Sequence, residues 1–266
     1  MRSFDHKINF VLIAGPLLII AILVGMVLLD YHRPNATKAS ITELIQWLGG
    51  DYRWLAGAKE LIRRGRNDFV ITELRESLTN SNPKIATGAE YVLFRLGDEA
   101  DERFQSLVAR VTSNDLTLAP GRAGLYLGNC LEPQDAKYAP VLVRTFEEVS
   151  DSDPWIKSIL IRAISHMPEA PGVVQFLRDR AKDPSEVVRQ ELSVALGTVI
   201  ETRQGVIIAQ WIIDTFRMLA FDRESDVRFQ AIKTLREYRS YPAVNELLLE
   251  IAESGISQDD RDNARS

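Results

Sequence analysis

The stretch DPSEVVRQELSVALG, residues 183–197, and the later stretch DRESDVRFQAIKTLRE, residues 222–237, decide the fold. Each begins with an acidic residue, continues to a Val-Arg pair, and then places a small or apolar residue at every third or fourth position. That spacing is typical of an amphipathic α-helix, whose buried stripe returns every 3.6 residues. One helix pattern that occurs twice in this way predicts a structural repeat.

From about residue 39 onward, the chain alternates between turn signals and amphipathic stretches. The apolar–polar alternation that is typical of strands is nearly absent. Several prolines fit the first turn of a helix, where a missing N–H costs nothing, and three of them follow an Asn or Asp that can cap the helix. The prolines are Pro83, Pro120, Pro154 and Pro184, and the capping residues are Asn82, Asp153 and Asp183.

The predicted helices form pairs with a period of roughly 30–40 residues. Because one helical hairpin buries only one face, this period indicates stacked units rather than one compact core. The first helices are expected at 52–64, 83–96, 120–130, 154–166, 184–200 and 226–238, and the second helices at 67–79, 100–112, 133–149, 171–181, 204–220 and 242–254.

These residues resemble the first helix of HEAT repeats, including the short bacterial type. Val188–Arg189 and Val227–Arg228 match that pattern best, and residues 85–97 and 54–65 match it more loosely because they lack the arginine. The resemblance covers residues 51–255 and implies an α-solenoid. It also implies an inter-repeat ladder in which each arginine reaches an acidic residue or a carbonyl group of the neighbouring unit. The ladder residues are Asp183, Arg189, Asp222 and Arg228.

The first thirty residues contain a long apolar segment. Residues 8–29 carry no charged side chain, and a helix of that length spans roughly 33 Å, close to the hydrocarbon thickness of a bilayer. The core of a cleaved signal peptide is shorter, about 7–15 residues, so we expect an uncleaved anchor. A secreted solenoid with a cleaved signal remains the alternative. The anchor residues singled out are Ile8, Phe10, Gly15, Pro16 and Leu29.

We therefore predict an all-α fold, an α-solenoid of about six HEAT-like helical hairpins preceded by one transmembrane helix. Residues 1–7 are a flank, 8–29 the transmembrane helix, 30–50 a linker with a short amphipathic helix, 51–255 the repeat domain and 256–266 a polar C-terminal tail. Arg and Lys are balanced across the span, and only the terminal amine favours an N-terminus inside. We expect a single-pass membrane protein with the repeat domain on the extracytoplasmic, periplasmic side.

Composition excludes several function classes. The net charge of -5 gives no bulk attraction for nucleic acid, so no nucleic-acid partner is expected. The chain has a single cysteine, Cys130, so an internal disulfide framework is excluded. Beyond the apolar segment and its flanks, Cys130 and His166 are the only Cys and His side chains, and two such ligands are too few for a usual zinc site. Glycine-rich phosphate loops and the usual hydrolase motifs are absent. We expect no catalytic residue, no cofactor and no metal, and we interpret Cys130 as a buried small apolar residue.

Two patches are candidate partner surfaces. The first is Arg63, Arg64 and Arg66, which either form a solvated turn at a helix C-terminus or, if the domain is cytoplasmic, contact anionic headgroups. The second lies at 205–221, where a wide apolar arc includes Trp211, Ile212 and Phe216. That arc indicates either a helix covered by its neighbours or a docking face.

A solenoid offers a long, rigid surface and little from which to build a catalytic pocket. We therefore expect a membrane-anchored scaffold, an accessory subunit that binds and stabilises other proteins of a membrane complex. The alternative is a HEAT-type enzyme or chromophore-handling lyase with a pocket on its concave face.

Overall fold

The computed structural model describes residues 36–50, 53–113, 115, 118–202 and 208–265. The predicted transmembrane segment, with Ile8, Phe10, Gly15, Pro16 and Leu29, lies outside these residues. Within them, no helix combines the length and the apolar character that crossing a bilayer requires. They contain fourteen α-helices and no strand, so the fold of this part of the chain is all-α, as the sequence predicts.

Most of the predicted helices lie within two residues of their predicted bounds, but those expected to begin at 133 and 204 begin at Ala139 and Gln210. They are α2 (Ile41–Leu48), α3 (Trp54–Arg64), α4 (Asp68–Ser77), α5 (Pro83–Arg95), α6 (Ala100–Val111), α7 (Pro120–Cys130), α8 (Ala139–Glu148), α9 (Pro154–Ser165), α10 (Val173–Arg180), α11 (Glu186–Thr202), α12 (Gln210–Ala220), α13 (Ser225–Glu237), α14 (Pro242–Ser254) and α15 (Gln258–Arg265). Two short 3-10 helices, η1 (Ala36–Lys38) and η3 (Pro133–Tyr138), precede α2 and α8.

The predicted caps are present in part. Pro83, Pro120 and Pro154 begin their helices, and the side chain of Asn82 accepts a hydrogen bond from a backbone N–H of α5. Asp153 precedes α9 but makes no side-chain cap bond, because its backbone is not in the extended conformation that an N-cap requires.

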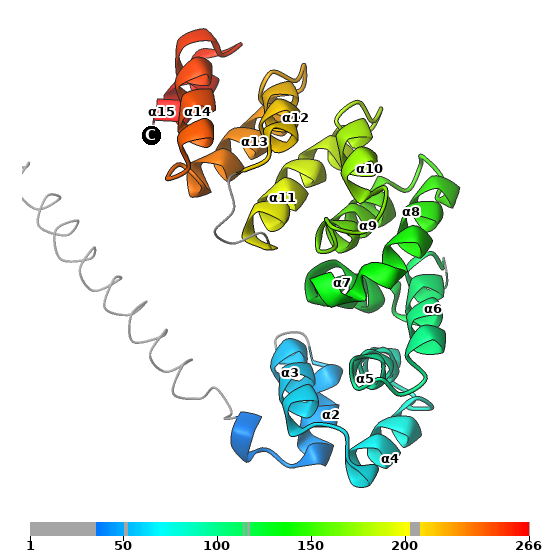
Figure 1. Cartoon of the computed structure of the whole chain (residues 1–266). Helices are drawn as coiled ribbons and strands as arrows, with labels where there is room; N and C mark the ends of the chain where they lie inside the picture. The colour runs from blue at the N-terminus through cyan, green and yellow to red at the C-terminus, as the bar shows by residue number, and fades with distance from the viewer. Residues whose placement is uncertain (1–35, 51–52, 114, 116–117, 203–207, 266) are drawn as a thin grey trace, which may run out of the picture.

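The hairpins stack into an arc with two rows of helices (Figure 1). Helices α5, α7, α9, α11 and α13 form the inner row, in which each packs against the next. Helices α4, α6, α8, α10 and α12 form the outer row. The apolar core follows this layering, since buried residues extend from Leu44 in α2 to Ala264 in α15. The described residues are therefore an α-solenoid.

Packed helices flank the predicted repeat domain of 51–255. Helix α2 lies in the predicted linker and packs on α3 and α5, with a capping box formed by Ser40 and Glu43. Residues 256–266 were expected to be a polar tail, but α15 lies there and packs on α13 and α14. The start of α15 is capped by two hydrogen bonds. The backbone N–H of Ser257 donates to the carboxylate of the buried Asp260, and the backbone N–H of Asp260 donates to the hydroxyl oxygen of Ser257.

Candidate functional site

An ion-pair ladder connects the last three units. The guanidinium of Arg189 in α11 donates to the carboxylate of Asp222, with Nε–Oδ2 at 2.7 Å and Nη2–Oδ1 at 3.0 Å. Arg228 in α13 donates from Nε to Oδ2 of Asp260 at 2.8 Å. These pairs are 33 and 32 positions apart along the chain, so each arginine reaches into the following unit.

Each arginine also secures the start of its own helix. Nη1 of Arg189 donates to the carbonyl oxygen of Asp183 at 2.7 Å, and Nη1 of Arg228 donates to that of Asp222 at 3.0 Å. Asp222 therefore serves two units, through its carboxylate and its carbonyl group. The carboxylate of Asp183 instead accepts the backbone N–H of Ser185. The structure thus brings the four ladder residues predicted from sequence into one continuous network.

Sequence reasoning missed Asp260. Asp260 is only 4 % exposed, whereas the neighbouring Asp259 is exposed. The spacing contained the signal, because Asp260 follows Arg228 at nearly the interval that separates Asp222 from Arg189.

Both ladder carboxyls stay ionised. Burial alone raises the pKa of Asp222, but hydrogen bonds from Arg189 and from the N–H of Glu224 outweigh it and lower that pKa. Burial likewise opposes hydrogen bonds from Ser257 and Arg228 at Asp260, and the net pKa is lowered. The ladder is therefore a set of charge pairs at neutral pH.

Four of the five helices of the inner row leave a large apolar side chain exposed. Helices α7, α9, α11 and α13 each carry one exposed large apolar residue, and these are Leu125, Trp155, Val187 and Phe229. A hollow of about 110 Å³ lies between α7 and α9. It is lined by Leu125 and Trp155 together with Gly121, Gly124 and Ile159. At one rim, Arg162 holds Glu191 of α11 by two hydrogen bonds, of 2.6 and 2.8 Å. The hollow has about the volume of a single side chain.

The second predicted partner surface requires correction. Ile212 is 1 % exposed and Phe216 is fully buried, because the neighbouring helices α11, α13 and α14 pack on α12. Trp211 is half-buried against the same core. These side chains cannot form a docking face. The apolar arc instead belongs to a covered helix, which was the other interpretation of the sequence.

The three arginines of the first predicted surface have different environments. Arg64 is mostly buried and donates to the carbonyl oxygens of Ala36 at 3.2 Å and Ala39 at 2.6 Å, so it is structural rather than free for a partner. The carboxylate of Glu60 accepts hydrogen bonds from both Arg63 and Arg64, which lower its pKa to about 2. The side chains of Arg63 and Arg66 remain exposed.

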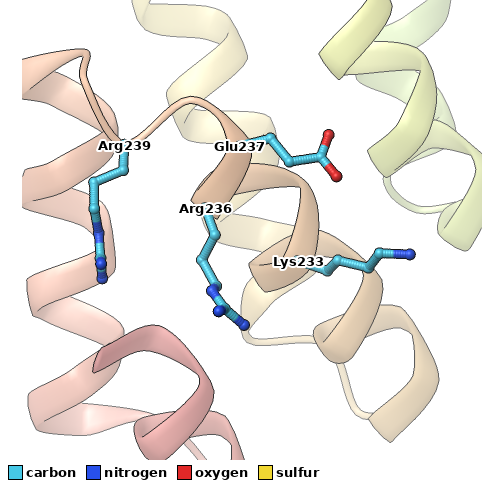
Figure 2. Close-up of a pocket in the computed structure, with 4 residues that line it drawn as sticks. All are labelled: Lys233, Arg236, Glu237 and Arg239. Atoms are coloured by element: carbon cyan, nitrogen blue, oxygen red, sulfur yellow. The ribbon is translucent and has the colours of Figure 1, made fainter. Parts of the chain in front are cut away.

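A second basic group lies at the end of α13 (Figure 2). Lys233, Arg236, Glu237 and Arg239 line an open hollow of about 390 Å³. Arg236 and Arg239 point in the same direction, while Lys233 and Glu237 point away from them. Arg239 donates to the carbonyl oxygen of Ala264 at 2.8 Å, so part of this group secures α15.

The remaining reactive groups are partly buried. Cys130 is half-buried, and burial raises the pKa of its thiol. The ring Nε2 of His166 lies 3.2 Å from the carbonyl oxygen of Gly128, and burial lowers the pKa of this histidine. Across the described ranges, no group of three His, Cys, Asp or Glu side chains is arranged to hold a metal ion.

Comparison with solved structures finds similar helical chains at low identity. YibA of Escherichia coli is 20% identical, with a TM-score of 0.49 over 86% of this chain and 81% of that one. An archaeal HEAT-like repeats protein from Thermococcus onnurineus NA1 is 13% identical, with a TM-score of 0.44 over 85% and 95%. An engineered protein is 18% identical, with a TM-score of 0.41 over 75% and 94%. No family model matches the chain, and no curated protein matches it.

Proposed function

We propose that this protein is a membrane-anchored repeat scaffold, an accessory subunit that binds and stabilises other proteins of a membrane complex. The observation that carries the proposal is the succession of exposed apolar residues along the inner row. Four neighbouring helices of the inner row each leave one large apolar side chain exposed to water. A partner that covers these side chains removes apolar surface from water, which favours binding. The apolar segment at residues 8–29 supports the anchored form.

Trp155 is the central contact in this proposal. Its side chain is 52 % exposed beside the hollow between α7 and α9, and tryptophan is the residue type most enriched where truncation weakens protein binding. A partner side chain inserted beside Trp155 and Leu125 would be enclosed on several sides. The enzyme or lyase alternative stays a prediction from the sequence.

The test uses the full chain, extracted from membranes in mild detergent and purified by affinity. We expect a stoichiometric protein partner to co-purify. Trp155→Ala should weaken its binding by about 2 kcal/mol, roughly thirtyfold in Kd. The matched control is Leu249→Ala, which removes a residue of similar exposure, 57 %, from helix α14. Partner recovery that is unchanged by Trp155→Ala and by a Leu125→Ala/Trp155→Ala double variant would contradict the proposal.

A further inference from the structure

Helix α3 has an exposed face that is almost entirely basic. Between Arg53 and Arg66 the exposed residues are Arg53, Ala56, Lys59, Arg63 and Arg66. Within α3, Ala56, Lys59 and Arg63 recur every three or four positions, so they share one face of the helix, and Arg53 and Arg66 lie just before and just after it. The same stretch has five basic residues and one acidic residue, a local charge of +4 in a chain whose total is -5. We call these exposed residues the basic stripe.

The charges of the basic stripe are only partly compensated. Glu60, the acidic residue of this stretch, is 5 % exposed and shared between Arg63 and Arg64. Arg66 lies 3.8 Å from Asp98, a carboxylate that Arg75 already holds at 2.7 Å. Over the described ranges, neither Arg53 nor Lys59 has an ion-pair partner, although Arg53 lies over the ring of Trp47 at 5.7 Å. The stripe therefore presents a net positive surface to solvent.

The position of the stripe is fixed relative to the start of the described chain. Arg64 binds the carbonyl oxygens of Ala36 and Ala39, which holds the first described residues against α3. Six residues, 30–35, separate Ala36 from the predicted span, and six residues reach at most about 20 Å. An anchor that ends at Leu29 therefore keeps α3 close to the headgroups.

We propose that the basic stripe of α3 rests on an anionic phospholipid surface, an inference that depends on the anchored form of the proposed function and on anionic lipid in the leaflet that faces the repeat domain, whether that leaflet is cytoplasmic or, as expected from the sequence, extracytoplasmic. Phe69, in the first turn of α4 and three residues beyond Arg66, is 59 % exposed, so this end of the stripe also carries an exposed aromatic side chain close in sequence. Lipid fits this surface better than nucleic acid does, because the rest of the chain is acidic and the tether places α3 beside a bilayer.

The experiment compares two lipid compositions. The full chain is reconstituted into nanodiscs of phosphatidylcholine alone or of phosphatidylcholine mixed with phosphatidylglycerol. A water-soluble acylating reagent then labels lysines, and mass spectrometry gives the rate at each position. Lys59 should label about fivefold more slowly in the anionic discs, since a basic residue near such a surface gains that order of occupancy. Exposed Lys182, between α10 and α11, is the internal control and should not change.

A second arm identifies the source of protection. An Arg53→Gln/Arg63→Gln double variant should restore the Lys59 rate in anionic discs, with circular dichroism confirming the fold. Equal Lys59 rates in both compositions overturn the inference while leaving the scaffold proposal standing. Protection by inorganic phosphate in phosphatidylcholine discs also overturns it, since the site would then be one for free anions. A chain that does not co-elute with the discs removes the anchor and this inference together.

Discussion

The pairing of Arg228 with Asp260 should decide whether α15 stays attached to the solenoid. The two charged groups lie 2.8 Å apart, with side chains 8 % and 6 % exposed. Removing one partner of a buried ion pair costs about 3–5 kcal/mol, because the other charge is left without compensation. Arg228 keeps two backbone carbonyl partners, those of Asp222 and Arg223, so we expect the lower end of that range.

Asp260→Ala also removes the carboxylate that accepts the N–H of Ser257 at the first turn of α15, a cap worth about 1 kcal/mol. The total loss is then about 4 kcal/mol, near the low end of the whole stability of a folded protein. Because each unit of a repeat protein contacts only its neighbours, we expect α15 to detach while the distant hairpins stay folded.

Hydrogen exchange measured by mass spectrometry on the full chain tests this prediction. Asp260→Ala should accelerate amide exchange in α15 by at least about a hundredfold, which corresponds to roughly 3 kcal/mol of local opening, with α5 and α7 unchanged. Asp259→Ala is the matched control, since this neighbouring carboxylate is exposed and its loss should cost under about 0.5 kcal/mol. If the two variants exchange alike in α15, the ladder does not stabilise this end and the reasoning is wrong.

Three further predictions concern stability. Asp222 and Asp260 have lower pKa values in the folded protein than their unperturbed value of 3.8. The stability that they contribute is therefore present above pH 3.8 and is lost as the pH falls through their folded pKa values. The melting temperature should drop on acidification below about pH 4, and it should drop less in Asp222→Asn. Gly57→Ala should destabilise by about 1–3 kcal/mol in urea titrations, because the added Cβ would lie 2.8 Å from a carbonyl oxygen of α2; an unchanged midpoint would show that the two helices separate freely. Tyr126→Phe should stabilise by about 1 kcal/mol, since the buried hydroxyl has no hydrogen-bond partner among the described residues; a loss of stability would mean that a hydrogen bond had been broken.

The helix pattern could be predicted because it is local. Cap residues, prolines and apolar spacing determine where α7 and α14 begin and end, and both helices have their predicted bounds. The resemblance of the two Val-Arg pairs to HEAT repeats also implied the ladder. These features depend on residues close together in the chain, which is why a repeat protein is easier to predict from its sequence than a compact globule.

The candidate surfaces were harder to predict because exposure depends on which neighbour covers each helix. The apolar arc around Phe216 has a similar composition whether it meets solvent or another helix, and only the packing of α11, α13 and α14 decides between them. For Trp155 the difficulty is the reverse, because its side chain is exposed. It follows a proline at the start of an ordinary helix, and nothing in the local sequence indicates that exposure. Asp260 was missed although it lies 32 positions from Arg228, nearly the interval of the predicted Arg189–Asp222 pair, because no Val-Arg pair follows it to indicate a further unit.

The position of Asp260 has a consequence for engineering. Helix α15 supplies to Arg228 the carboxylate that the start of a further hairpin would otherwise bring, so Asp260 takes the place of the acidic residue of a next unit. Inserting extra copies of residues 183–221 ahead of Asp222 should lengthen the solenoid without redesign of either end. At every junction, an arginine equivalent to Arg189 would meet an aspartate 33 positions further along the chain. Length in this protein is thus an adjustable quantity.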